Sequence, residues 1–403
     1  MKSNTSGNHG TEVRMKFAHI ADCHLGGWKN PEMQELNLKT FEKAIDLCIR
    51  EKTNFVLITG DLFDNAMPSI DILKAAANKL RELKENKIPC YIIAGSHDYS
   101  ASGKTFLDVL EKAGLCENIE RIKNDILEII EKPDIILAGI SGKKGELEKE
   151  LIKKIKIPNM GDKLKILALH TTIEENKTND FMDGIKISEL PKGFDYYALG
   201  HIHKPFKQEI NGKIIAYPGP LFPNNFSELA ELGNGGFLLV NLNKKLETER
   251  YEIKLKNIFS IEIDAGSKSP EIVNSEIIQK IKHDNIKDKI VMVKISGTLA
   301  RGKTSDINLR EIEEEAKKAG CYSLLKNTSG LESPEFSIKT DIKTENVDEI
   351  EKEIIAKQKI DDFSKFTEIL LKSMEMEKME GEKNETFEKR LFDEFSKVFN
   401  IKL

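Results

Sequence analysis

Short apolar runs alternate with amphipathic segments between residues 15 and 250. Eight runs have the length and content of buried strands, and three longer segments repeat apolar residues at helical spacing. The expected strands lie within residues 15–22, 54–61, 90–98, 134–140, 165–172, 194–203, 213–219 and 235–242, and the expected helices within 31–52, 69–86 and 104–114. Alternation of this kind predicts a layered α/β domain over residues 15–250.

A smaller unit follows, and its pattern predicts the order strand, helix, strand, helix, strand over residues 257–335. This is a small α+β domain with enough residues for a modest core. Beyond Pro334 the chain is strongly charged, so residues 336–360 are expected to form a linker. Two amphipathic segments within 361–403 predict a helical hairpin, which either binds a partner or docks on its own domain.

Composition places the chain among globular proteins. Its 403 residues are too many for one ordinary hydrophobic core and suggest two or three domains. Of these residues, 39% are hydrophobic and 32% are charged. No apolar run has the length of a membrane span, and residues 1–14 lack the apolar centre of a secretory signal. We therefore expect those residues to be a disordered extension, and the protein to stay in the compartment where it is made.

Cysteine usage and net charge exclude some classes of site. Five cysteines without CxxC spacing argue against a disulfide framework and against a thiolate zinc site. A net charge of -5 gives no sign of a large basic surface for nucleic acid. Cations bound by carboxylates reverse the local field, however, so a phosphate-bearing substrate stays compatible with this charge.

Polar residues that bind metals in many proteins follow five of the expected strands. In chain order they are Asp22 and His24, then Asp61, then Ser96, His97 and Asp98, then His170, and last His201 and His203. Loops after the strands of an open α/β sheet converge at one edge, where ligands bind. A single aspartate or histidine in such a place is usually a turn former or a surface residue, but five occurrences favour one shared site.

The residue types indicate the chemistry of that site. His201 and His203 have the spacing of residues that point the same way on an extended backbone, so both imidazoles are expected to face one small volume. Mixed carboxylate and imidazole ligands suit Mn²⁺, Fe²⁺ or Zn²⁺ better than Ca²⁺. A carboxylate such as Asp61 can bridge two ions, and such a pair activates water for phosphoester hydrolysis. Cys23, between two candidate ligands, is expected to point into the core.

At these residues the sequence resembles the calcineurin-like metallophosphoesterases, whose motif order is D-x-H, G-D, G-[NS]-H-D, H and G-H-x-H. The words MKFAHIADCHLGG, GDLFDNAMPS, AGSHDYSASGKT and YYALGHIHKP look like those of double-strand-break repair nucleases of the meiotic recombination protein eleven and SbcD type, and the flanking words look archaeal. The resemblance spans residues 15 to about 335. It implies a four-layer α-β-β-α metallophosphoesterase sandwich, a small α+β capping domain and the C-terminal helical hairpin.

The resemblance also implies a role for each motif residue. One cation would be held by Asp22, His24, Asp61 and His203, and a second by Asp61, Ser96, His170 and His201. His97 would donate a proton to the leaving oxygen, and Asp98 would orient either the loop or the ring. The implied cofactors are two Mn²⁺ per chain, with Mg²⁺ or another divalent metal as the alternative.

Two positions depart from the family pattern. Ser96 stands where asparagine is common, and a hydroxyl is a weaker and shorter ligand than an amide carbonyl. The second cation is therefore expected to be held more loosely, or through water. Asp64 stands where many relatives carry a second histidine, which leaves His97 as the obvious acid.

The implied activity is Mn²⁺-dependent, with 3′-to-5′ exonuclease action on duplex DNA ends and endonuclease action on single strands. The implied partners are a second copy, joined through helices near residues 69–86 and 104–114, and an SMC-like coiled-coil ATPase bound to the C-terminal hairpin. The location would be cytoplasmic in a prokaryote and nuclear in a eukaryote. Candidate DNA phosphate contacts in the loops near the ligands are Lys29, Lys104, Lys204 and Lys207. A phosphodiesterase for small phosphoesters and a catalytically weak DNA-binding scaffold stay open as alternatives.

A further motif, GTLARGKT at residues 297–304, matches the phosphate-binding loop pattern G-x-x-x-x-G-K-[ST]. In such a loop a helix begins directly at the lysine and threonine. Here SDIN intervenes, and Ser305 or Asp306 is expected to cap the following helix. We therefore expect a tight turn whose Arg301 and Lys303 contact a DNA backbone, in place of an ATP site.

Overall fold

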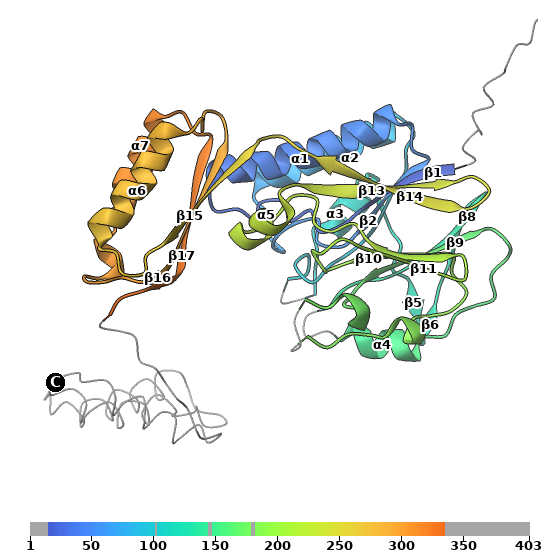
Figure 1. Ribbon diagram of the computed structural model, residues 1–403. Helices are drawn as coiled ribbons and strands as arrows, with labels where there is room; N and C mark the ends of the chain where they lie inside the picture. Colours follow the sequence, from blue (N-terminus) through green and yellow to red (C-terminus); the bar gives the residue numbers. More distant parts are fainter. Residues whose placement is uncertain (1–14, 101–102, 144–146, 179–181, 335–403) are drawn as a thin grey trace, which may run out of the picture. The chain divides into compact units, whose positions relative to one another are not determined.

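The computed structural model describes residues 15–100, 103–143, 147–178 and 182–334. Two six-stranded sheets form the larger part of the fold, and a three-stranded sheet follows them in the chain (Figure 1). Within these ranges, no helix combines the length and the apolar content that crossing a membrane requires. The expectations for residues 1–14, 336–360 and 361–403 fall outside the described part of the chain.

The first sheet carries the first three metal-binding motifs. Its order is β14-β13-β1-β2-β3-β4, and β1, β2 and β3 run parallel, as helical connections require. Its strands are β1 (Met15–Ile20), β2 (Phe55–Thr59), β3 (Cys90–Ile93), β4 (Glu117–Asn118), β13 (Gly235–Leu242) and β14 (Leu246–Ile253). Because the three central strands are parallel, the loops that follow them meet at one edge.

The second sheet carries the other two motifs, in the order β11-β12-β10-β9-β8-β7. Its strands are β7 (Ile130–Glu131), β8 (Ile135–Ile140), β9 (Leu164–His170), β10 (Tyr196–Gly200), β11 (Phe206–Ile210) and β12 (Lys213–Tyr217), and a separate hairpin contains β5 (Ile122–Lys123) and β6 (Ile126–Leu127). Strands β9 and β10 are parallel, with Gly200 opposite His170. The fourth and fifth motifs therefore begin side by side.

Three apolar clusters hold these layers together. Between the two sheets, Phe17 stacks on Phe55 at 4.6 Å between ring centroids and meets Tyr196 edge to face. Helices α1 (Pro31–Arg50), α2 (Ile70–Glu85) and α3 (Leu107–Lys112) bury their apolar faces on the outside of the first sheet. On the outside of the second sheet lie α4 (Glu148–Lys154) and 3-10 turns at Glu174–Asn176 and Ile187–Glu189. The layers thus run helices, sheet, sheet, helix.

Polar caps begin the helices. The side chain of Asn30 accepts a hydrogen bond from the amide of Met33 at 2.9 Å, with Pro31 at the first helical position. Ser69 caps α2 in the same way. Asn225 caps α5 (Phe226–Leu232), a helix that the sequence analysis did not predict.

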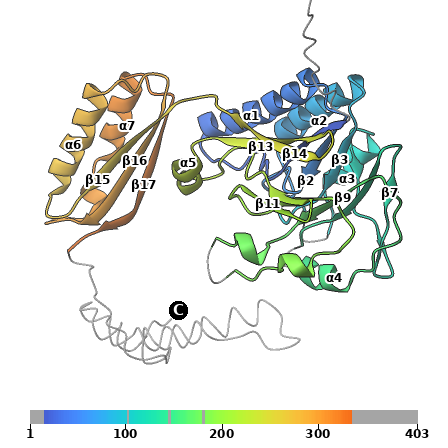
Figure 2. The same cartoon turned by 45° about the vertical axis from the view of Figure 1, so that its right-hand side comes forward.

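The smaller sheet has the order β15-β16-β17, formed by β15 (Ile258–Asp264), β16 (Ile290–Thr298) and β17 (Ser323–Glu332). Helices α6 (Pro270–His283) and α7 (Leu309–Lys318) lie side by side on one face of it (Figures 1 and 2). The order of elements is the one that the sequence pattern predicts. The chain as a whole forms two compact units, of which the second includes residues 265–270 and 297–307.

The cap predicted for α7 is wrong. The helix begins after Asn308, whose side chain accepts a hydrogen bond from the amide of Glu311 at 3.2 Å. Thr304–Asp306 forms a separate 3-10 turn, in which the amide of Lys303 donates to Asp306 at 2.8 Å. A phosphate-binding loop needs a helix that begins directly at its lysine and threonine. No helix begins there in the GTLARGKT motif, as predicted.

Candidate metal centre

Six of the seven predicted ligands form two adjacent groups. Asp22, His24 and His203 make up the first group, and Asp61, His170 and His201 the second, with the ligand atoms of each group within 4.8 Å of one another. The groups touch, because Nε2 of His24 lies 3.7 Å from Oδ2 of Asp61. Four of the five motif loops supply these side chains, which come from both large sheets.

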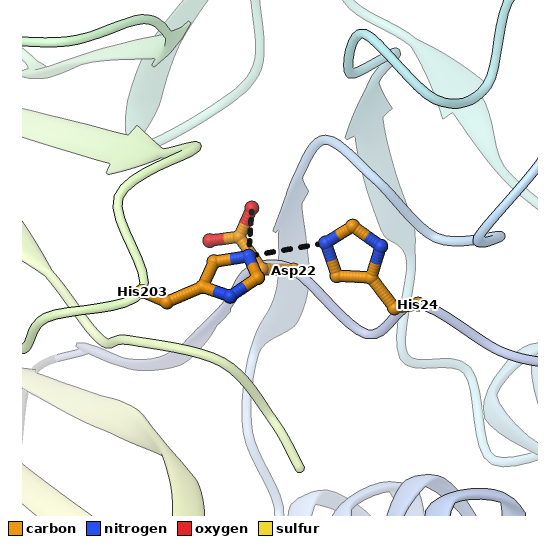
Figure 3. A group of neighbouring side chains, drawn as sticks. All are labelled: Asp22, His24 and His203. Carbon is orange, nitrogen blue, oxygen red and sulfur yellow. Dashed lines mark hydrogen bonds and ion pairs between the residues drawn. The ribbon is translucent and has the colours of Figure 1, made fainter. Parts of the chain in front are cut away.

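The first group brings two imidazole nitrogens face to face. Nε2 of His24 and Nε2 of His203 are 3.1 Å apart, and Nε2 of His203 lies 4.0 Å from Oδ1 of Asp22 (Figure 3). His24 and Asp22 are almost completely buried. Buried nitrogens and carboxylate oxygens that converge in this way form a donor set suited to a divalent cation.

The second group contains a buried nitrogen that lacks a hydrogen bond. Nδ1 of His170 faces the carbonyl oxygen of Thr59 at 2.9 Å, and since a carbonyl only accepts, this nitrogen carries the proton and donates. Nε2 of His170 has no hydrogen-bond partner and lies 3.2 Å from Oδ2 of Asp61. This nitrogen therefore faces the carboxylate, and either a proton or a cation between them would satisfy both groups.

Electrostatics at the second group favour bound positive charge. Burial by itself raises the pKa of Asp61, but His170 and His24 outweigh it and hold that pKa below its ordinary value. Burial likewise lowers the pKa of His170, while the opposing effect of Asp61 is large enough to raise it to about 10. Without a cation, a proton on His170 balances Asp61. Bound there, a divalent cation would supply the positive charge in place of that proton.

Four of the ligands sit in the left-handed region of backbone conformation. The φ angles are 50° at Asp22, 43° at His24, 48° at Asp61 and 95° at His201. Such residues cost on the order of 1–3 kcal/mol each and persist where their surroundings hold them. Here the amide of His24 donates to the carbonyl of Asp61, and the amide of His201 donates to Oδ1 of Asp22, both at 2.9 Å.

This backbone corrects one expectation and confirms another. His201 is not extended, and the side chains of His201 and His203 enter different groups, so the reasoning from an extended backbone was wrong at this pair. Cys23 is buried in the core cluster between the first sheet and its helices, as predicted.

Glycines in the motifs allow the loops to approach closely. A Cβ at Gly60 would lie 2.1 Å from Nδ1 of His170, and a Cβ at Gly95 would lie 2.1 Å from Oδ1 of Asp61. Both distances are far below van der Waals contact. The glycines of the G-D and G-S-H-D motifs therefore make room for the ligands themselves.

The loop after β3 carries Ser96, His97 and Asp98. Asp98 is buried and accepts hydrogen bonds from the amides of Gly95 at 2.8 Å and Phe63 at 3.1 Å, so it ties this loop to the loop after β2. Burial, with Asp61 nearby, raises the pKa of Asp98 to about 7. Of the two roles expected for Asp98, these bonds favour orientation of the loop. Ser96 lies half-buried between Gly95 and His97.

The ring of His97 is exposed and is oriented by a different residue. Its Nδ1 lies 2.7 Å from the carbonyl oxygen of Asp64, which leaves Nε2 outward. Its amide donates to Oδ1 of Asp61 at 2.8 Å, so the loop and the second group are directly joined. The ring also contacts His24, with 4.8 Å between centroids.

A cleft of about 570 Å³ opens onto both groups. Its lining includes His97, Lys204 and a residue that the sequence did not indicate, Lys177. The other predicted phosphate contacts, Lys29, Lys104 and Lys207, are exposed elsewhere, as are Arg301 and Lys303 in the second unit.

Sequence reasoning missed three residues that hold the ligands. Glu228 on α5 faces Nδ1 of His203 at 3.0 Å, Asn224 donates to Asp64 at 3.0 Å, and Thr59 offers its carbonyl to His170. The pattern N-x-x-E at Asn225 and Glu228 is a helix-start signal that the sequence contains. It predicts the helix but says nothing of the histidine that the glutamate reaches.

Comparisons with known proteins agree with this geometry. Residues 15–205, which include all the predicted ligands, match the model of the calcineurin-like phosphoesterase family. The chain is 30% identical over 353 residues to the DNA double-strand break repair protein Mre11 of Archaeoglobus fulgidus, covering 80% of this chain and 76% of that protein.

Proteins of the same name in two other organisms are also similar. The one from Sulfolobus acidocaldarius is 29% identical, over 82% of this chain and 87% of its own length. The one from Methanocaldococcus jannaschii is 29% identical, over 70% of this chain and 82% of its own. With its ligands in two adjoining groups at the edge of two sheets, the chain belongs to the Mre11 family of calcineurin-like phosphoesterases.

Proposed function

We propose that this protein is a DNA double-strand-break repair nuclease that hydrolyses phosphodiester bonds with a pair of Mn²⁺ ions. The observation that carries the proposal is the position of Asp61, whose carboxylate lies between the two ligand groups, 3.2 Å from His170 and 3.7 Å from His24. The similarity to proteins named for DNA double-strand break repair supports DNA as the substrate. The cleft contains Lys177 and Lys204, whose positive charges suit a phosphate backbone.

Each side chain has a part in this reaction. Asp22, His24, Asp61 and His203 would hold one cation, and Asp61, Ser96, His170 and His201 the other. When bound, the pair lowers the pKa of water and neutralises charge on the attacked phosphate. His97, with Nδ1 donating to the carbonyl of Asp64, would act as the imidazolium, pass its Nε2 proton to the leaving oxygen and be left neutral. Asp98 keeps the loop of His97 in place through backbone hydrogen bonds.

The finer activity that we propose is 3′-to-5′ exonuclease action on duplex ends with endonuclease action on single strands. Lys204 and Lys177 are the phosphate contacts nearest the cations, and Lys29, Lys104, Lys207, Arg301 and Lys303 would follow the DNA farther out. The protein would work with an SMC-like ATPase bound by residues 361–403, in the cytoplasm of a prokaryotic cell.

A homodimer formed through α2 and α3 completes the proposal. Exposed apolar side chains on and next to these helices support it: Met67 is 76% exposed, Ile70 82% and Val109 54%. Exposed apolar side chains that lie together mark association surfaces. Two copies would place two cleavage sites on the two strands of a DNA end.

The test compares the purified chain with Asp61→Ala, using duplex DNA with Mn²⁺, duplex DNA with Mg²⁺, and bis-p-nitrophenyl phosphate with Mn²⁺. We expect Mn²⁺-dependent cleavage of DNA that Asp61→Ala lowers by more than about 100-fold, because loss of an outer partner of a metal ligand alone costs 10–100-fold. Rapid hydrolysis of the small ester without DNA cleavage would support the phosphodiesterase alternative instead. Metal binding without hydrolysis of either substrate would support the scaffold.

A further inference from the structure

We propose that Asp64, Asn224 and Glu228 form a brace that aims His24 and His203 at their shared cation. The inference rests on the metal centre of the proposed function and deepens it. None of the three belongs to the ligand set, and Asp64 stands where the family pattern predicts a histidine. The brace makes them positioning residues for manganese binding.

Glu228 holds the ring of His203. Its Oε1 lies 3.0 Å from Nδ1 of His203, so that this nitrogen donates and Nε2 keeps its lone pair. The carboxylate is itself fixed, because the amide of Asn224 donates to Oε2 at 2.9 Å and the side chain of Asn225 donates to Oε1 at 2.6 Å. A ring held through Nδ1 by a fixed carboxylate has one orientation and a more basic Nε2.

Asp64 lies in the corresponding place behind His24. Its Oδ1 lies 3.2 Å from Nδ1 of His24, while its backbone carbonyl holds His97. One residue therefore faces a metal ligand with its side chain and the proposed acid with its main chain. The neighbouring His24 and Asn224 hold the pKa of the Asp64 carboxyl below its ordinary value against the effect of partial burial.

Asn224 joins the two carboxylates. Its side-chain amide donates to Oδ1 of Asp64 at 3.0 Å, and its backbone amide donates to Glu228. Space for this contact depends on Gly27, where a Cβ would lie 2.2 Å from Oδ1 of Asn224 and 2.8 Å from Oδ1 of Asp64. The brace thus links the loop after β1, the loop after β2 and the start of α5.

The result is a site that is shaped before the cation binds. A carboxylate lies beside each Nδ1, and the two Nε2 atoms face each other at 3.1 Å, the distance of a hydrogen bond through one proton. Carboxylates behind the two rings keep both Nε2 atoms turned toward one point, where a cation would replace that proton.

The experiment is calorimetric titration of Mn²⁺ into the metal-free full chain. The parent is compared with the variants Asp64→Ala and Glu228→Ala. Each is compared with a control that removes an exposed carboxylate outside the cleft, Asp71→Ala on α2 and Glu209→Ala on β11. We expect the two brace variants to weaken one of the two binding events by roughly 10–100-fold, and the controls to leave both within about twofold.

Conservative variants separate positioning from general stability. Asp64→Asn and Glu228→Gln keep an oxygen that accepts from Nδ1, so we expect them to recover affinity to within about tenfold of the parent, with metal-free melting temperatures like those of the controls. Brace variants that bind Mn²⁺ as tightly as the controls would overturn the brace, as would alanine and conservative variants that lose affinity equally. A parent chain that binds two Mn²⁺ but cleaves no DNA would refute the nuclease and leave the brace standing.

Discussion

The exposed imidazole of His97 has a role that is separable from metal binding. Its ring is held by the carbonyl of Asp64, and its side chain is outside the predicted ligand set. We expect His97→Ala to lower the turnover number for DNA by about 10²–10⁴, the usual contribution of a general acid, while Mn²⁺ affinity stays within a few-fold. Rate measurements at saturating Mn²⁺, paired with calorimetry, test this. A parent-like rate would remove His97 from the mechanism.

Buried His19 makes the metal-free protein sensitive to acid. The ring lies between the sheets, with Tyr196 Oη at 2.9 Å and Thr59 Oγ1 at 3.0 Å, and burial lowers its pKa from 6.5 to about 3. The folded pKa lies below the unfolded one, so the folded state binds fewer protons. The stability that the neutral ring of His19 contributes is fully present above pH 6.5 and is lost as the pH falls toward 3.

At pH 5 this linkage amounts to about 2 kcal/mol for the one group. We expect the loss in free energy of unfolding between pH 7 and pH 5 to be smaller by about that amount in His19→Gln than in the parent, whatever the variant costs at pH 7. Urea unfolding in the presence of a chelator, at both pH values, measures it. Equal losses in the two proteins would contradict the assignment.

At the scale of elements, the loops after the parallel strands are held to one another by ligands and backbone together. The loop after β3 is tied to the loop after β2 through Asp98 and through the amide of His97. Gly95 lies at the closest point between them, since its Cα has no room for a methyl group beside Asp61.

We therefore expect Gly95→Ala to lower the free energy of unfolding by roughly 1–3 kcal/mol, as overpacking does, and to weaken Mn²⁺ binding because Asp61 must move. Gly161→Ala is the control, because a Cβ there meets nothing within 4 Å. Thermal melts and calorimetry of the two variants give the comparison. A Gly95→Ala chain that matched Gly161→Ala in both would show that the loops tolerate a wider separation.

For the whole molecule, association through α2 and α3 has a direct test. Ile70→Glu combined with Val109→Glu places charge on the exposed apolar surface without disturbing the core. We expect light scattering to show a mass of twice 45.6 kDa for the parent and 45.6 kDa for the double variant. Ile272→Glu, at an exposed position on α6, should keep the parent's mass. A monomeric parent would refute the dimer.

The sequence by itself determined the elements and the chemistry of the site. Periodicity is local, so the runs around residues 54–61 and 194–203 predicted their strands, and the polar residues at the strand ends predicted Asp22, Asp61 and His170. Helices α4 and α5, of seven residues each, were not among the predicted helices.

Only the tertiary structure decided how the ligands are shared and held. His24 meets His203 across 179 positions of sequence, and Asp64 meets Asn224 across 160. Left-handed backbone at His201 sends it to Asp61 while His203 goes to Asp22. Contacts of this kind follow from the pairing of strands and the packing of two sheets, and the local sequence pattern does not indicate them.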